Sequence, residues 1–194
     1  MNRLLIVFTL IWFSGCAVQQ PSRSGSSSTS TPTYSVPAPT KSEECRLSYS
    51  DNPNVTYSIN PNVTYKWNPD VTYAINPNVT YAINPNVTYK YNPNVTYSIN
   101  PNVTTSLNPY IGQWSGYNVC TPSGELIGAS VIANEDVMVI YTGNKWIGQF
   151  VTNRRGGYNY FNRENEWRGF LVPTASGGFA FFNKEKEWVL SLTK

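Results

Sequence analysis

The sequence predicts an all-β protein in two parts, and three observations carry that prediction. β-Branched and aromatic residues are plentiful, whereas no long segment shows the helical period of apolar residues. An octapeptide repeats in perfect register over residues 52–107, and a longer unit of 21 residues begins at Trp146 and again at Trp167. These observations predict a solenoid-like β region over residues 45–109, followed by a small antiparallel β meander or barrel over residues 110–194.

The octapeptide consensus is N-P-N-V-T-Y-x-[IWYL], and seven copies follow one another from Asn52. Its Val, Tyr and Ile alternate with polar residues, which is a strand pattern, and its even length gives every copy the same face. Proline at the second position suits a type I turn but cannot adopt the positive φ of tight hairpin turns. The array therefore favours a β-solenoid with Asn-Pro-Asn corners over a hairpin stack. An extended, disordered spacer is the alternative prediction.

Each 21-residue unit is expected to form a strand, a glycine turn, a second strand and a charged turn. Nine of the 21 positions are identical between the two units. Trp146, Gly148 and Phe150 share one face of an ideal strand, and Gly156-Gly157 supplies positive φ for the first turn. Eight short strands are expected, near residues 115, 128, 139, 149, 160, 170, 181 and 190. Short turns between sequential strands predict a meander, and closing it into a barrel would remove its exposed edges.

The chain opens with a basic residue and an apolar stretch over residues 4–13, which leads into Ser14-Gly15-Cys16. Such a stretch is typical of a secretory signal and is too short to span a bilayer. Small residues before a cysteine resemble the lipobox of bacterial lipoproteins. The resemblance implies that residues 1–15 are removed and that Cys16 is acylated, which would anchor the chain to a membrane of the cell envelope. Because Ala17 rather than Asp follows the cysteine, the resemblance implies the outer membrane. An ordinary signal peptide with an incidental cysteine is the alternative.

The segment after the lipidation site is rich in Ser, Thr and Pro. Residues 16–44 have almost no apolar side chains to bury, so they predict a disordered tether. The two remaining cysteines, Cys45 and Cys120, flank the octapeptides. An even pair in an oxidising compartment predicts a disulfide, and two unpaired thiols are the alternative.

The composition argues against most catalytic and cofactor chemistry. The chain has no histidine, which removes His-based triads and His metal sites, and three cysteines with separate fates make no zinc cluster. A net charge of +3 is no nucleic-acid signature. Glu164 and Glu166 recur one unit later as Glu185 and Glu187, so they indicate a solvated turn rather than a glycosidase pair. We therefore expect no enzyme, no metal, no cofactor and no nucleic-acid partner.

Differences between the two units point to a candidate binding site. The first unit has Asn-Arg-Arg where the second has Thr174-Ala175-Ser176, and it has asparagine where the second has Ala180. The candidate ligand-binding residues are Arg154, Arg155, Tyr158, Asn159 and Tyr160. Aromatic faces beside Arg and Asn donors suit glycans or anionic polymers. The sequence thus favours a non-enzymatic envelope lipoprotein that displays a β module for binding glycan, peptidoglycan or a host surface. A structural or antigenic repeat spacer without a specific ligand is the alternative.

Overall fold

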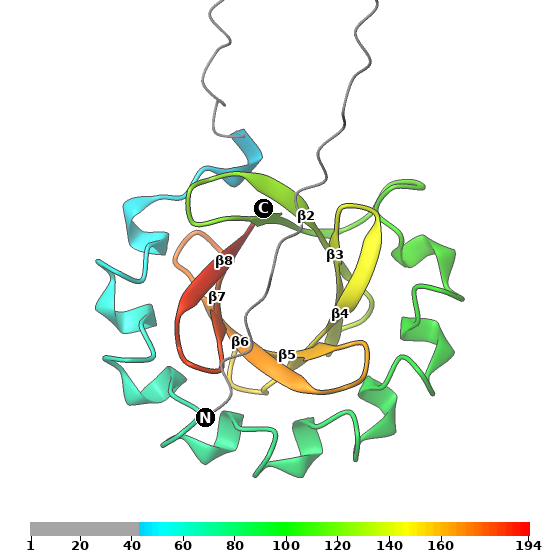
Figure 1. Ribbon diagram of the computed structural model, residues 1–194, viewed down its shortest axis with the longest axis horizontal. Coiled ribbons are helices and arrows are strands. Elements are labelled where there is room, and N and C mark those ends of the chain that lie inside the picture. The colour runs from blue at the N-terminus through cyan, green and yellow to red at the C-terminus, as the bar shows by residue number, and fades with distance from the viewer. Residues whose placement is uncertain (1–42) are drawn as a thin grey trace, which may run out of the picture. The chain divides into compact units, whose positions relative to one another are not determined.

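Eight antiparallel strands in sequence order close into a barrel in which β1 pairs with β8 (Figure 1). The structure is a computed structural model that describes residues 43–194. The predicted signal, the lipidation site Cys16 and most of the predicted tether lie outside the described residues. The last two residues assigned to that tether begin a short 3-10 helix, η1 (Glu43–Cys45).

The predicted meander and its closure are confirmed. The strands are β1 (Gly116–Cys120), β2 (Leu126–Ile132), β3 (Val137–Thr142), β4 (Lys145–Thr152), β5 (Tyr158–Asn162), β6 (Trp167–Pro173), β7 (Phe179–Asn183) and β8 (Trp188–Thr193). The two glycines of the β4–β5 turn are required for different reasons. Gly156 has a φ of 93°, which the turn requires, whereas a Cβ on Gly157 would lie 2.4 Å from the Leu171 carbonyl oxygen. Gly177 and Gly178 repeat this division between β6 and β7.

A β-bulge near the start of β4 changes which face its tryptophan occupies. Trp146 pairs with Tyr141 and Gly148 pairs with Ile140, so Ile147 is the extra residue between them. Phe150 lies in the cluster that fills the barrel, but Trp146 packs in a separate cluster on the outer surface. The prediction that these two side chains share a face was therefore wrong, because a bulge inserts one residue and reverses the alternation. The indole N–H of Trp146 donates to the Gly148 carbonyl oxygen at 2.7 Å.

The octapeptides are ordered but contain no strand. Each copy makes an Asn-Pro-Asn-Val turn, then a linking threonine, then one turn of 3-10 helix over the last three residues. The helices after η1 are η2 (Tyr49–Asp51), η3 (Tyr57–Ile59), η4 (Tyr65–Trp67), η5 (Tyr73–Ile75), η6 (Tyr81–Ile83), η7 (Tyr89–Tyr91), η8 (Tyr97–Ile99) and η9 (Thr105–Leu107). We call residues 52–109 the belt, because they run around the outside of the barrel (Figure 1).

The expected β-solenoid is not confirmed, and local hydrogen bonds explain why. In the copy that begins at Asn76, the side-chain Oδ1 of this residue accepts from the N–H of Asn78, and its carbonyl accepts from the N–H of Thr80. These bonds hold the turn through Val79, so too few residues stay extended to form a ladder. Neighbouring copies are tied by the Thr80 hydroxyl, which donates to the carbonyl of Tyr73 at 2.6 Å.

Each copy buries its last side chain against the outer wall of the barrel. These residues are 0–8% exposed and comprise Ile59, Trp67, Ile75, Ile83, Tyr91, Ile99 and Leu107. The third-position asparagines add polar contacts to the barrel turns, since Asn62, Asn86 and Asn94 donate to backbone carbonyls there at 2.8–3.1 Å. The repeats therefore pack against the outer wall of the barrel. In a solenoid, the neighbouring coils would have provided this apolar surface.

The belt passes the strands in reverse order before the chain enters β1. Glu44 accepts a hydrogen bond from Thr193 of β8, Ile59 packs with Phe182 of β7, and Leu107 packs with Val131 of β2. The expected disulfide is present: Cys45 and Cys120 are joined across a sequence separation of 75. The bond fastens the segment that precedes the belt to the end of β1.

Candidate functional site

The five residues predicted to bind ligand do not form one surface. Tyr158 and Tyr160 pack inside the barrel with Phe179 and Phe181, at ring-centroid distances of 5.5 and 5.3 Å. Burial raises the pKa of Tyr160 to about 12, so its hydroxyl stays protonated and donates to the Ile147 carbonyl oxygen at 3.1 Å. These two tyrosines are partly buried and pack against the core cluster inside the barrel.

Asn159 lies between the barrel and the belt, where it is 1% exposed. Its Nδ2 donates to the carbonyl oxygen of Ile75 at 3.1 Å. Asn159 therefore fixes the belt to β5 and offers no exposed donor to a ligand. The second unit has Ala180 at this position, so the sequence difference marks a belt contact.

The two arginines of the β4–β5 turn are exposed and face the belt. Arg154, which has a φ of 58°, donates from Nη2 to the Tyr91 hydroxyl at 2.9 Å, and this bond raises the pKa of the guanidinium. Arg155 lines a cavity of about 340 Å³ together with Lys66. Of the five predicted residues, the two arginines are exposed, the two tyrosines are partly buried inside the barrel, and Asn159 is buried.

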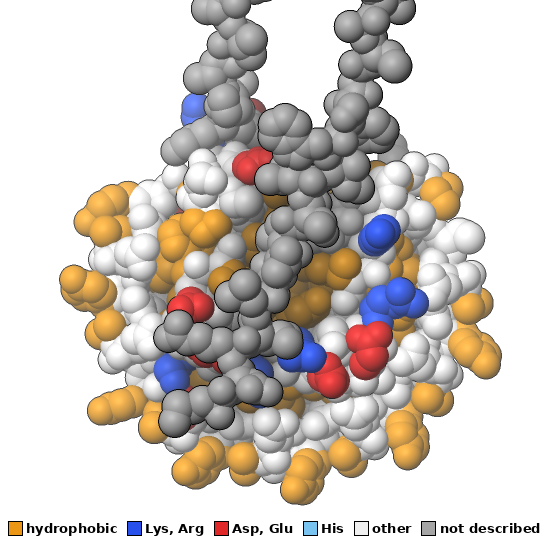
Figure 2. Space-filling view, viewed as in Figure 1, with side chains coloured by type: hydrophobic (Ala, Val, Ile, Leu, Met, Phe, Trp, Pro, Cys, Tyr) orange, Lys and Arg blue, Asp and Glu red, His pale blue; other side chains and the backbone are white. Residues whose placement is uncertain are grey.

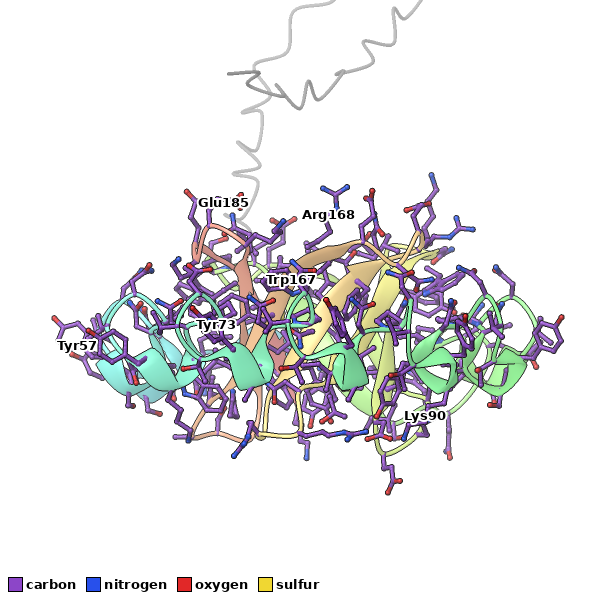
Figure 3. All side chains as sticks on the ribbon, turned by 90° about the horizontal axis from the view of Figure 1, so that it is seen from below. Tyr57, Tyr73, Lys90, Trp167, Arg168 and Glu185 are labelled. Carbon is purple, nitrogen blue, oxygen red and sulfur yellow. A yellow bond between two sulfur atoms is a disulfide. The ribbon has the colours of Figure 1, made fainter. Side chains whose placement is uncertain are left out.

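The largest exposed apolar feature of the described residues is one that sequence reasoning missed. The sixth residue of each of the first six copies is 61–76% exposed, and these residues are Tyr57, Tyr65, Tyr73, Tyr81, Tyr89 and Tyr97. We call this set the tyrosine rim. The valines two positions earlier in each copy are 38–58% exposed. Apolar side chains accordingly project around the outer edge of the molecule in Figure 2, and Figure 3 shows Tyr57 at the outside of the belt.

The signal for this rim was present in the sequence but was misread. The alternation of apolar and polar residues predicted that Val, Tyr and Ile of each copy share one buried face. In most copies only the last residue and the proline are buried. The Asn-Pro turn signal and the repeated tyrosine were sufficient to predict a regular surface. These sequence signals could not show that the octapeptides would bury their inward-facing side chains against the barrel.

A second hollow lies at the end of the barrel that carries Arg168 and Glu185 (Figure 3). Its volume is about 600 Å³, and its lining includes Lys145, Trp146 and Arg163. The Arg163 guanidinium lies 5.1 Å from the centroid of the Trp146 ring. Because the protein's own cation covers this aromatic face, the hollow is a poor platform for stacking a ligand.

The carboxylates of the two charged turns are held by hydrogen bonds within those turns. Glu166 accepts hydrogen bonds from Asn162 and Arg168, which lower its pKa and keep it ionised in the solvated β5–β6 turn. Glu187 makes the equivalent bond with Asn183 at 2.7 Å. Within residues 43–194 no group of three or more His, Cys, Asp or Glu side chains is placed to hold a metal ion.

Comparison with known proteins gives no relative for this chain. No family model, no curated protein and no solved structure matches it. In the part of the chain that the structure describes, no helix is long and apolar enough to cross a membrane.

Proposed function

We propose that the protein is a non-enzymatic binding module, tethered to the bacterial outer membrane through Cys16, that holds glycan chains of the cell wall on its tyrosine rim. The observation that carries the proposal is the repetition of one exposed tyrosine per octapeptide over six copies. An exposed aromatic side chain that recurs in every one of these copies makes the rim a candidate interaction surface. A tyrosine ring offers a flat apolar face and a polar hydroxyl, which suits the C–H faces and hydroxyls of sugars.

The charge of the belt supports a sugar polymer over a nucleic acid. Among residues 52–109 the charged side chains are Lys66, Asp70 and Lys90. Asp70 is paired with Lys186, and Lys90 is paired with Asp136. The rim is therefore close to neutral, whereas nucleic-acid affinity depends on many unpaired cations.

The regular spacing of the rim suits a ligand that is itself a repeating chain. The first six copies present the same tyrosine in the same local fold, so one repeating chain can engage several copies at once. Linked weak sites raise the overall affinity well above that of one site. The belt also docks on the barrel copy by copy, which favours a fixed number of octapeptides over the free variation expected of a spacer or antigenic repeat.

The experiment is co-sedimentation of the protein with purified peptidoglycan and with chitin, a neutral polymer of N-acetylglucosamine. The test variant replaces Tyr73, Tyr81 and Tyr89 with threonine, the residue that stands at this position in the last copy, Thr105. Wild type should sediment with the polymer, and the variant should remain largely in solution because three stacking faces are lost.

A matched control replaces Val71, Val79 and Val87, which lie in the turns preceding these tyrosines, with threonine. It removes exposed apolar area without removing a ring, so it should retain most of the binding. Equal binding by wild type and both variants would overturn the proposal. Failure of the wild type to bind, together with concentration-dependent self-association in sedimentation velocity, would favour the repeat-assembly alternative.

A further inference from the structure

Residues that depart from the consensus of the octapeptides lie close to residues that differ between the two 21-residue units. Lysine occupies the seventh octapeptide position only at Lys66 and Lys90, and each precedes an aromatic residue. The β4–β5 turn carries Arg154 and Arg155 where the equivalent turn of the next unit has Ala175-Ser176. Both lysine-bearing copies lie against this turn: Arg154 bonds the Tyr91 hydroxyl, and Arg155 shares a cavity with Lys66.

The two lysines have different electrostatic surroundings. Lys90 Nζ lies 2.7 Å from Asp136 Oδ2, a hydrogen-bonded ion pair that raises the pKa of the ammonium group. Within residues 43–194, Lys66 and Arg155 have no carboxylate partner; the Lys66 ammonium only lies 4.5 Å from the centroid of the Trp67 ring. The cavity between these two residues therefore holds two cations whose charge the protein does not balance.

The walls of this cavity are held in place by the belt and the barrel. Its lining residues are Lys66, Thr72, Ala74, Ile75 and Arg155. Ile75 is 2% exposed, and its carbonyl is fixed by Asn159 of β5. The Thr72 hydroxyl donates to the carbonyl of Tyr65 in the preceding copy. The site is thus a preformed hollow with an apolar floor and two cationic side chains at its edge.

Two members of the tyrosine rim are direct chain neighbours of the lining residues. Tyr65 precedes Lys66 and is 76% exposed, and Tyr73 lies between Thr72 and Ala74 and is 61% exposed. Tyr65 and Tyr73 therefore belong to the same two octapeptides as the belt residues that line the cavity. Guanidinium and ammonium groups form strong, charge-assisted hydrogen bonds with carboxylates.

We propose that this hollow, which we call the seam cavity, binds the carboxylate of an acidic sugar in a polysaccharide whose neighbouring sugars lie on the tyrosine rim. The inference rests on the proposed function, because the rim is what favours a polysaccharide over an acidic peptide. The inference adds that the polysaccharide must carry a carboxylate, which binding to the neutral rim alone does not require. Lys66 and Arg155 are the specificity-determining residues.

The experiment measures binding of the full chain to polygalacturonate and to its methyl ester, two polymers that differ in the charge of the carboxyl group. Wild type should bind polygalacturonate about tenfold more tightly, as expected for charge-assisted bonds to one carboxylate. Lys66→Ala and Arg155→Ser place residues that already occupy equivalent positions elsewhere in the chain. Each should remove most of the preference and leave binding of the methyl ester unchanged.

Two charge controls accompany these variants. Lys90→Ala removes the lysine that Asp136 already balances, and Lys145→Ala removes a cation from the opposite end of the barrel. Both should keep the preference for polygalacturonate. Loss of the preference in all four variants would show a general charge effect and would overturn the proposal.

The outcomes separate this inference from the proposed function. Equal, tyrosine-dependent binding of both polymers would overturn the seam cavity and leave the rim intact. Preferential binding of poly-glutamate over polygalacturonate would overturn the polysaccharide assignment in favour of a peptide carboxylate. No binding of either sugar polymer would overturn the inference, while chitin and peptidoglycan would still test the rim.

Discussion

Replacing Ile99 with alanine tests whether the belt is held by its inward-facing side chains. Ile99 is 1% exposed and packs in a cluster with Val137, Val151 and Phe161. The change removes three carbon atoms, a loss of roughly 2.4 kcal/mol at 0.8 kcal/mol per buried methylene. The cavity left behind adds to this, so we expect a loss of about 3–4 kcal/mol in the free energy of unfolding. The melting temperature should fall by about 6–16 °C for a chain of this size.

The matched control is Tyr97→Ala in the same octapeptide. Tyr97 is 66% exposed, so its loss should change the free energy of unfolding by no more than about 0.5 kcal/mol. Urea unfolding followed by tryptophan fluorescence and circular dichroism measures both variants. Equal effects of the two substitutions, or a larger effect of Tyr97→Ala, would refute the arrangement of the belt and with it the exposed rim.

Four further changes test other parts of the structure. Reduction of the Cys45–Cys120 bond should lower the free energy of unfolding by about 4.5 kcal/mol in the chain-entropy model; a shift under 1 kcal/mol in denaturant titration would contradict this. Deleting residues 76–83 should destabilise the protein more than Ile99→Ala does, because every later copy loses its place on the barrel; an unchanged melting curve would argue for a loose spacer. Wild type should lose stability below about pH 4 relative to Asp51→Asn, and parallel pH profiles of unfolding would refute this. Cys16→Ser should abolish acyl labelling, and a labelled variant would disprove lipidation there.

The pH prediction follows from the surroundings of Asp51 at the start of the belt. Burial alone would raise the pKa of this carboxyl, but hydrogen bonds from Ser48 and Ser176 outweigh burial and lower it. A carboxyl whose pKa is lower in the folded state stabilises the fold fully above its unfolded pKa. That contribution is lost as the pH falls through the folded pKa.

The barrel could be predicted from the sequence because its signals are local. Each glycine turn and charged turn was read directly, and eight strands were found near the expected positions. The bulges could not be predicted in this way, because the extra residue at Ile147 has no distinctive sequence. One inserted residue was enough to move Trp146 from the predicted face to the opposite one.

The belt could not be predicted because its structure depends on a partner surface within the same chain. A repeat that buries only its proline and its last side chain cannot bury them alone, so its conformation is decided by the barrel. The prediction that five residues form one ligand-binding site was wrong for a related reason. The position where the units differ at Asn159 is a contact with Ile75 of the belt, and Arg154 and Arg155 are the exposed members of the five candidate residues.

The Cys45–Cys120 bond has a topological consequence. The belt passes outside the strands from β8 to β2 before the chain enters β1, so the bond closes residues 45–120 into a covalent ring with β2–β8 inside it (Figure 1). If the bond formed first, either the C-terminal strands would have to enter a closed loop or that loop would have to pass over one end of the barrel. The barrel therefore assembles most simply while the belt is still open, with oxidation as the final step. Once oxidised, the belt cannot be removed from the barrel without passing over one of its ends.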